Sequence, residues 1–184
     1  NIAMGYEEPK YNIIKSTENY EIRKYEDRLA VEVEYSKENS GFQYLFKYIS
    51  GANITSEKVN MTVPVTQSVK IDMTKPVTQS TKDGKMLMQF FLPSKFTIEN
   101  APQPTNKKVR LVIIEGGIYA IIQYSGRLTN KNYLKHYKKL KDHLNKDKIN
   151  FNEPAIRATF NAPFTLPIFR RNEIMMKINY NENT

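Results

Sequence analysis

The feature that most constrains the fold is a succession of two alternating segments and one amphipathic segment, which occurs twice along the chain. In the first copy, apolar and polar residues alternate from Tyr20 to Tyr25 and from Leu29 to Tyr35, around a turn at residues 26–28. This period of two predicts strands, and the short turn predicts that they pair as a hairpin. A helix is expected from about Glu38 to Ser50, with Gly51 as its stop.

The second copy follows the same plan. Strands are expected from Val109 to Glu115 and from Ile118 to Tyr124, paired around the turn Gly116-Gly117. A helix is expected from Asn130 to Leu144, and Thr129 or Asn130 can cap its first turn. Further strands are expected at residues 59–69, 77–79 and 85–92 after the first helix, and at 155–160 and 173–179 after the second.

The repeated β-β-α-β-β unit predicts an α+β protein with a curved, mostly antiparallel sheet, two outer helices and an approximate two-fold relation between its halves. The 184 residues are within the usual size of a single domain with one core. We interpret the proline-rich stretch Pro93 to Pro104 as a packed connection within that domain, because Phe96 and Ile98 are apolar anchors. Glu32 and Glu34 alternate with apolar residues, which predicts an outward, solvated face.

A shorter repeat lies in the first half, where MTVPVTQS (Met61 to Ser68) returns as MTKPVTQS (Met73 to Ser80). Two copies are too few for a solenoid, and the offset suits an edge hairpin or two successive strands. Pro64 and Pro76 are expected at a sheet edge or bulge, because proline cannot donate a ladder hydrogen bond. The role of the repeat stays open between strand chemistry and a ligand-facing rim.

Five ordered segments carry a family resemblance. The last is NAPFTLPIFRRNEI, in which a proline-shaped approach leads through Arg-Arg-Asn-Glu into a strand. The others are YEIRKYEDRLAVEVEY, then FQYLFKYISGAN with KVNMTVPV, then FFLPSKFTIENAPQPT, and then IIQYSG. Together they resemble the SOUL/haem-binding protein family. The resemblance implies a distorted β-barrel, and we expect an N-terminal extension at 1–19, a SOUL-type domain at 20–180 and a tail at 181–184.

The resemblance also implies haem or another tetrapyrrole as the ligand, bound on a shallow apolar surface of the first helix beside a basic side chain, without a shared axial histidine. The matching positions are Phe42 and Phe46, with Lys47 next to them. Helical spacing places these phenylalanines in one stripe with Leu45 and Ile49. Such a stripe is more often core than cofactor face, so Leu45 and Ile49 favour core, while Phe42 and Phe46 are open to either interpretation.

Other chemistry finds little support in the residue pattern. The chain has no cysteine, which excludes disulfides, thiolate catalysis and Cys-ligated metals, and it lacks phosphate-binding glycine motifs. The two histidines, His136 and His143, are weak candidates for iron ligation, since both are expected among the lysines of the second helix. A Tyr or Met ligand is also left open, since the chain contains twelve Tyr and seven Met. No catalytic constellation is present, so we expect a protein that is not an enzyme.

The net charge of +9 does not by itself indicate nucleic-acid binding, because most of the lysines are scattered. The densest cluster, Lys131 to Lys148, is predicted to be an amphipathic helix with a solvated basic face, which we favour over a phosphate or anionic-lipid site. Its apolar stripe is expected to comprise Tyr133, Leu134, Tyr137, Leu140 and Leu144. No apolar run is long enough to span a bilayer.

In the final motif, Arg170 and Arg171 can bind propionates or lock the preceding loop to the last strand with Asn172 and Glu173, and we favour the lock. The function expected from the sequence is non-enzymatic tetrapyrrole binding by a monomeric carrier or buffer. The alternative is an effector-sensing or protein-interaction module on the same scaffold. The compartment stays open between cytoplasmic and, if a signal was removed before Asn1, exported.

Overall fold

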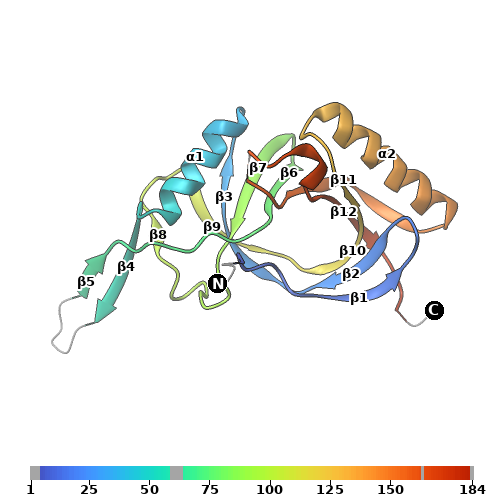
Figure 1. The fold of residues 1–184 in the computed structure, drawn as a ribbon. Coiled ribbons are helices and arrows are strands. Elements are labelled where there is room, and N and C mark those ends of the chain that lie inside the picture. The colour runs from blue at the N-terminus through green and yellow to red at the C-terminus, as the bar shows by residue number, and fades with distance from the viewer. Residues whose placement is uncertain (1–4, 59–63, 163, 183–184) are drawn as a thin grey trace. The chain divides into compact units, whose positions relative to one another are not determined.

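The computed structural model describes residues 5–58, 64–162 and 164–182. Its strands are mostly antiparallel and are accompanied by two α-helices, as expected for the α+β class (Figure 1). The chain divides into two compact units. Unit 1 comprises Asn1–Glu8, Arg28–Val77 and Thr81–Ile114, and unit 2 comprises Pro9–Asp27, Thr78–Ser80 and Glu115–Thr184.

Unit 1 contains an antiparallel arrangement in which β3 (Arg28–Glu34) lies between β7 (Lys85–Phe91) and β9 (Val109–Ile114). Helix α1 (Glu38–Ile49) packs against these strands (Figure 1). A smaller sheet has the order β5-β4-β8, with β4 at Asn53–Lys58, β5 at Pro64–Gln67 and β8 at Gln103–Pro104. Strand β6 (Val77–Lys82) contributes residues to both units.

The core of unit 1 follows the alternation of β3. Leu29, Val31 and Val33 are buried in one cluster with Leu45 and Ile49 of α1. Their neighbours in β3 point to the opposite face, because successive side chains of a strand alternate. One cluster of buried residues therefore fills the space between sheet and helix.

The expectation of a solvated face for Glu32 is wrong. Glu32 is only 6% exposed. Its carboxylate is satisfied by two hydrogen bonds, since Gln89 Nε2 donates to one oxygen at 2.8 Å and Arg110 Nη2 to the other at 2.6 Å. Glu34, in contrast, is exposed. Alternation identified the face correctly but could not show that a glutamine and an arginine of neighbouring strands would cover it.

Unit 2 contains five antiparallel strands in the order β1-β2-β10-β12-β11. These are β1 (Tyr11–Ser16), β2 (Glu21–Tyr25), β10 (Gly117–Tyr124), β12 (Asn172–Asn179) and β11 (Asn150–Thr159). Helix α2 (Asn130–Lys146) contacts β10 and β11. A second buried cluster includes Ile174 and Met176 of β12 with Leu140 and Leu144 of α2, so the buried residues form two clusters rather than the single core expected.

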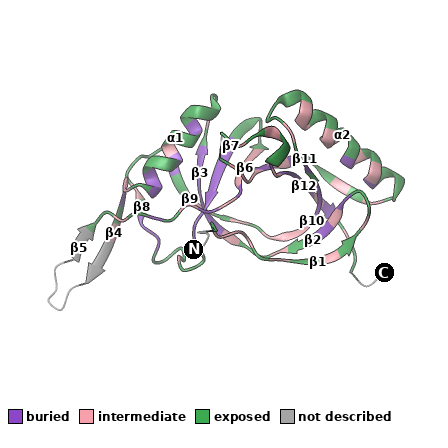
Figure 2. Ribbon diagram, viewed as in Figure 1, coloured by how far each residue is buried: buried purple, intermediate pink, exposed green. Residues whose placement is uncertain are grey.

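Helix α2 begins as predicted. The Thr129 side chain accepts a hydrogen bond from the backbone N–H of Asn132 at 3.1 Å, which caps the first turn. Leu134 differs from the prediction, because it is 58% exposed instead of joining the buried stripe. The stripe is therefore narrower than the sequence indicated, and the outer face of the helix is largely exposed (Figure 2).

The two predicted hairpins do not form. Strand β2 pairs with β1 and β10, whereas β3 pairs with β7 and β9, so each strand has its partners within its own unit. Likewise, β9 pairs with β3 in unit 1, whereas β10 pairs with β2 and β12 in unit 2. Alternation predicts a strand and its buried face but not its partner, and the short turns connect units instead of closing hairpins.

The connection near Gly116 is closely packed within unit 2. Its backbone N–H donates to Asp27 Oδ1 at 2.7 Å. A Cβ at this position would lie 2.3 Å from the carbonyl oxygen of Tyr25, so no larger residue fits without a backbone shift. The glycine predicted to form a hairpin turn is instead required by this close approach.

The prolines of the short repeat occupy different settings. Pro64 begins β5, an edge strand of the smaller sheet, while Pro76 precedes β6. Residues 59–63, which include the start of the predicted strand 59–69 and of the first repeat, lie outside the described residues. The proline-rich connection is packed, since Phe96 lies against the core of unit 1, although Ile98 is exposed. No described helix is both long and apolar enough to cross a bilayer.

Candidate functional site

The sequence of α1 produces a helix with two different apolar faces. The helix ends at Ile49, and Ser50 is its C-cap. Gly51 follows with φ of +128°, a conformation that favours glycine. Leu45 is 0% exposed and lies in the core of unit 1 together with Ile49. Phe42 and Phe46 are 37% and 51% exposed, so they are the members of the predicted stripe that a ligand can reach.

Phe42 and Phe46 form a preorganised aromatic pair. They are four residues apart, which places them one above the other on the helix, and their rings stack with centroids 6.0 Å apart and planes at 13°. Phe42 also packs edge-to-face on Phe90 of β7, with centroids 5.2 Å apart. Because this contact joins the pair to the buried core, the aromatic surface is supported by the sheet.

Cationic groups lie on α1 and beside it. Lys47 is exposed and follows Phe46 directly. Lys108 lies over the ring of Tyr44, with Nζ 5.4 Å from the ring centroid and 3.4 Å from the hydroxyl oxygen. An apolar surface bordered by ammonium groups suits a planar ligand that carries carboxylates.

The residues of α1 offer few donors to iron. Residues 38–49 contain neither His nor Met. The hydroxyl of Tyr48 donates to the carbonyl oxygen of Pro102 at 2.7 Å, and burial raises the pKa of this phenol above its ordinary value. This side chain is therefore committed to the core of unit 1, which leaves Tyr44 as the donor-type side chain on the more accessible part of the helix.

The two histidines of α2 are held by local contacts in unit 2. His136 Nδ1 lies 2.8 Å from the carbonyl oxygen of Asn132, and its ring stacks on Tyr124 with centroids 4.2 Å apart. His143 is half-buried about two helical turns further along nearly the same face, and its carbonyl oxygen accepts from Asp147 N–H. Among the described residues, no group of three or more His, Asp or Glu side chains is arranged to hold a metal ion.

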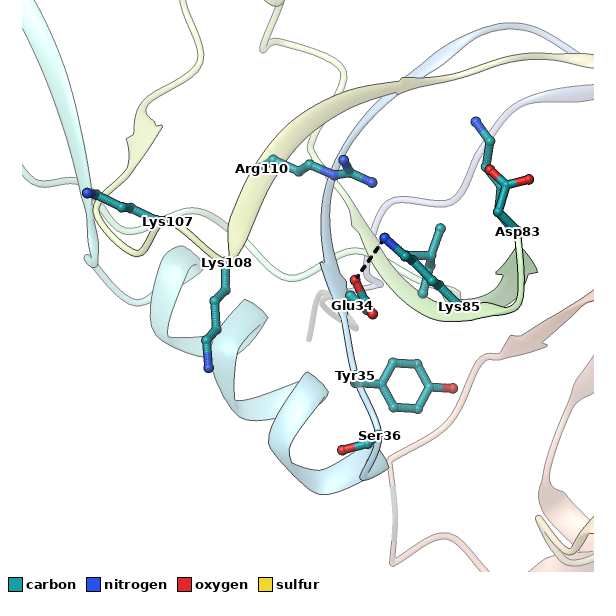
Figure 3. A pocket seen from close by; sticks show the side chains of 10 residues that line it. Glu34, Tyr35, Ser36, Asp83, Lys85, Lys107, Lys108 and Arg110 are labelled. Atoms are coloured by element: carbon teal, nitrogen blue, oxygen red, sulfur yellow. Dashed lines mark ion pairs between the residues drawn. The ribbon is translucent and has the colours of Figure 1, made fainter.

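A second feature of unit 1 is an open cavity of about 720 Å³, which we call the basic pocket (Figure 3). Five of its lining residues are cationic and two are acidic: Lys82, Lys85, Lys107, Lys108 and Arg110, with Glu34 and Asp83. Part of this charge is already paired, since Lys85 Nζ lies 3.9 Å from Glu34 Oε2, as the dashed line in Figure 3 marks. The excess of cations makes the pocket suited to anionic groups.

The RRNEI motif acts as the expected lock in unit 2. Arg170 is 6% exposed and donates through Nη1 to the carbonyl oxygens of Ala162 and Thr165, at 3.0 and 3.4 Å. Arg171 stacks on Phe160, with its guanidinium carbon 3.9 Å from the ring centroid. Asn172 Nδ2 donates to the carbonyl oxygen of Gly126 at 3.2 Å, which joins the final strand to the segment before α2.

Sequence reasoning missed a buried charge network around Glu173. Glu173 is 1% exposed. Its carboxylate accepts hydrogen bonds from Arg23 Nη1 at 2.9 Å, from Arg23 Nη2 at 3.3 Å and from Arg171 Nη2 at 3.2 Å. Arg23 is itself 3% exposed. The sequence does show an arginine in one predicted strand, Arg23, and a glutamate in another, Glu173. That the two side chains pair cannot be predicted without knowing the order of the strands in the sheet.

The family profile described as SOUL heme-binding protein matches residues 6–177 of the chain. The protein therefore belongs to the SOUL haem-binding protein family, as the five sequence segments indicated. No curated protein matches the chain significantly.

Solved structures support the fold. A hydrolase from Listeria innocua is 11% identical with a TM-score of 0.56, and an uncharacterised conserved protein from the same organism is 10% identical with a TM-score of 0.58. In both cases the similarity covers 96% of this chain and 94% of the other. At such identities the similarity concerns the fold alone, a mostly antiparallel curved sheet with two helices.

Proposed function

We propose that the chain binds haem or a related tetrapyrrole on the outer face of α1, as a monomeric carrier or buffer without catalytic activity. The observation that carries this proposal is the exposed, stacked pair of Phe42 and Phe46, which rests on Phe90 and is followed by Lys47. Membership of a family described as haem-binding supports the choice of ligand.

The residues present fit a planar macrocycle with acidic substituents. The two phenylalanines supply an apolar, aromatic contact surface, and the ammonium group of Lys47 can pair with a propionate. Leu45 and Ile49, which were candidates from sequence, support this surface from the core and do not contact the ligand. A bound haem would supply its iron and its visible absorption, while the protein supplies contact area and charge.

The proposal does not require coordination of the iron by α1, because its residues 38–49 carry no His or Met and Tyr48 is bonded to Pro102. Affinity then comes from the macrocycle and its propionates. We therefore expect haem and metal-free protoporphyrin to bind with dissociation constants within about tenfold of each other, a difference of about 1.4 kcal/mol.

A titration followed by absorbance tests the proposal. The wild-type chain is expected to saturate at one equivalent, and the Phe42→Ala/Phe46→Ala variant to bind at least about tenfold more weakly, because two large apolar contacts are removed. Ile113→Ala, which changes another exposed apolar residue of unit 1, is the matched control. His136→Ala and His143→Ala are expected to bind as the wild type does, and loss of binding in either would move the site to α2.

The proposal includes a duplicated architecture for the two halves of the chain. The element order β2-β3-α1-β4-β5 in the first half parallels β9-β10-α2-β11-β12 in the second, which supports an origin in one β-β-α-β-β unit. A distorted barrel with an approximate two-fold axis is the arrangement that we propose for such a duplication.

The basic pocket favours a second candidate function, an effector-sensing module for an anionic small molecule. Five cationic lining residues border a cavity large enough for such a ligand. This candidate predicts saturable binding of an anion that is weakened in Lys82→Gln/Lys107→Gln, without measurable affinity for tetrapyrroles. Tetrapyrrole binding that depends on Phe42 and Phe46 would instead favour the first candidate.

A further inference from the structure

Unit 2 exposes a short run of large apolar side chains, Phe164–Phe169, which we call the apolar loop. Its apolar members are far more exposed than is usual for such residues: Phe164 89%, Leu166 60%, Ile168 74% and Phe169 68%. The loop contains the 3-10 helix η1 (Pro167–Phe169), drawn mostly as exposed in Figure 2. Four large apolar side chains are thus exposed within six residues, and such a concentration of exposed apolar surface is typical of an interaction site.

The apolar loop is held in place by hydrogen bonds at its base. Arg170 donates to the carbonyl oxygens of Ala162 and Thr165, on either side of the start of the loop. The backbone N–H of Gly126 donates to the carbonyl oxygen of Pro167 at 2.8 Å. These bonds tie the loop to Gly126 and to the buried side chain of Arg170, so the loop is held before it binds and less ordering entropy is lost on binding.

The loop and the segment bonded to it belong to two stretches of sequence that carry cations and no carboxylates. The Gly126–Pro167 bond places the loop beside the segment that leads into α2, where Arg127, Lys131 and Lys135 are exposed. Residues 116–141 and 154–172 contain no Asp or Glu. Leu128, which is 41% exposed, adds a further apolar side chain in this segment.

We propose that the apolar loop inserts into the interfacial region of an anionic lipid bilayer, while Arg127, Lys131 and Lys135 contact the headgroups. The combination of an exposed apolar segment with nearby cations is typical of peripheral membrane binding, in which apolar burial and electrostatic attraction act together. Exposed apolar side chains can be buried in a deformable lipid surface, and the lack of carboxylates in residues 116–141 and 154–172 reduces repulsion by anionic headgroups.

Co-sedimentation with vesicles tests this proposal on the full chain. Vesicles of phosphatidylcholine alone are compared with vesicles that also contain phosphatidylserine. We expect binding to the anionic vesicles, weakened by salt, and a partition coefficient lower by at least about tenfold in Phe164→Ala/Phe169→Ala, because each aromatic side chain contributes apolar area. Lys131→Gln/Lys135→Gln is expected to lower it by about tenfold or more, since each cation near the surface contributes about a fivefold factor.

Matched controls separate this site from the net charge of +9. Ile13→Ala removes an exposed apolar side chain of β1, and Lys10→Gln/Lys15→Gln removes two exposed charges elsewhere in unit 2, so both are expected to bind about as the wild type does. Phe42→Ala/Phe46→Ala is also expected to bind vesicles normally, because these side chains belong to unit 1 and are not part of the apolar loop.

Three results would overturn the proposal. The first is the absence of binding to anionic vesicles at low salt. The second is binding that is equal in the wild type and in Phe164→Ala/Phe169→Ala, which would indicate adsorption by charge alone. The third is self-association that this double variant abolishes, without vesicle binding, which would make the apolar loop an interface between copies of the chain. Circular dichroism of each variant checks that it is folded.

Discussion

Replacing Glu173 with glutamine is expected to destabilise the protein strongly, because this carboxylate neutralises a buried arginine. Glu173 is 1% exposed and Arg23 is 3% exposed, and two donor–acceptor distances of 2.9 and 3.3 Å join them. Glutamine keeps the shape of the side chain but carries no charge. The guanidinium of Arg23 would then remain buried with only part of its countercharge.

The magnitude follows from the burial of both partners. Removing one partner of a buried ion pair costs about 3–5 kcal/mol of unfolding free energy. Arg23 keeps its 2.8 Å contact with Glu21, whose side chain is 35% exposed, so we expect a loss near the lower end, about 3 kcal/mol. For a chain of this size such a loss lowers the midpoint of thermal unfolding by about 6–12 °C.

Urea unfolding followed by circular dichroism measures this loss. Glu115→Gln is the matched control, because that side chain is 82% exposed and lies 3.9 Å from Lys177, and we expect a change below about 0.5 kcal/mol. The double variant Arg23→Met/Glu173→Met is expected to lose less than Glu173→Gln, since it leaves no unpaired charge at the pair. A Glu173→Gln variant within about 1 kcal/mol of the wild type would refute the reasoning.

Three further predictions concern other parts of the molecule. Burial raises the pKa of Tyr25 to about 12, above the ordinary value of 10, so its contribution to stability is present below pH 10 and is lost as the pH rises towards 12. Urea midpoints should fall over this range, and by less in Tyr25→Phe; an equal fall in both would count against the assignment. Gly116→Ala should cost about 1–3 kcal/mol in thermal unfolding, because its Cβ would lie 2.3 Å from a carbonyl oxygen, whereas Gly5→Ala, with nothing within 4 Å, should be neutral. Leu45→Ala should cost about 2–5 kcal/mol and the half-exposed Phe46→Ala about 1 kcal/mol in urea unfolding, and similar losses would contradict the division of α1 into a core face and a ligand face.

Local patterns were sufficient to predict most of the helices and strands. The helix expected from Glu38 was found at Glu38–Ile49, and the one expected from Asn130 was found with Thr129 as its cap. Capping, glycine stops and the 3.6-residue period are properties of neighbouring residues, so a single sequence contains them. The alternation did not predict β1 (Tyr11–Ser16) or β4 (Asn53–Lys58), which lie outside the expected strands.

The pairing of strands could not be predicted from the same patterns. Tyr20–Tyr25 and Leu29–Tyr35 looked like a hairpin, yet β2 pairs with β10 and β3 with β9, more than 75 residues away in sequence, as Ala120↔Ile22 and Arg110↔Glu32 show. The burial of Glu32 and of Glu173 depends on these distant partners. Charged residues at alternating positions therefore look solvated until the strand order is known.

The candidate site shows the same division between local and distant information. Helical spacing grouped Phe42, Leu45, Phe46 and Ile49, but only the position of the sheet distinguishes the buried pair from the exposed one. The contact of Phe42 with Phe90 could not be predicted, because it joins a helix to a strand. The exposure of the apolar loop was likewise hidden, since apolar residues in a sequence usually indicate a buried segment.

The most direct test of the central claim is a nuclear magnetic resonance experiment on the isotopically labelled chain with one equivalent of ferric haem. Because the paramagnetic iron broadens nearby signals, the proposed site predicts that the amide resonances of α1, residues 38–49, lose intensity, while those of α2, residues 130–146, keep it. The Phe42→Ala/Phe46→Ala variant should show little broadening at the same haem concentration. Broadening centred on α2, or no broadening that depends on Phe42 and Phe46, would contradict tetrapyrrole binding on the outer face of α1.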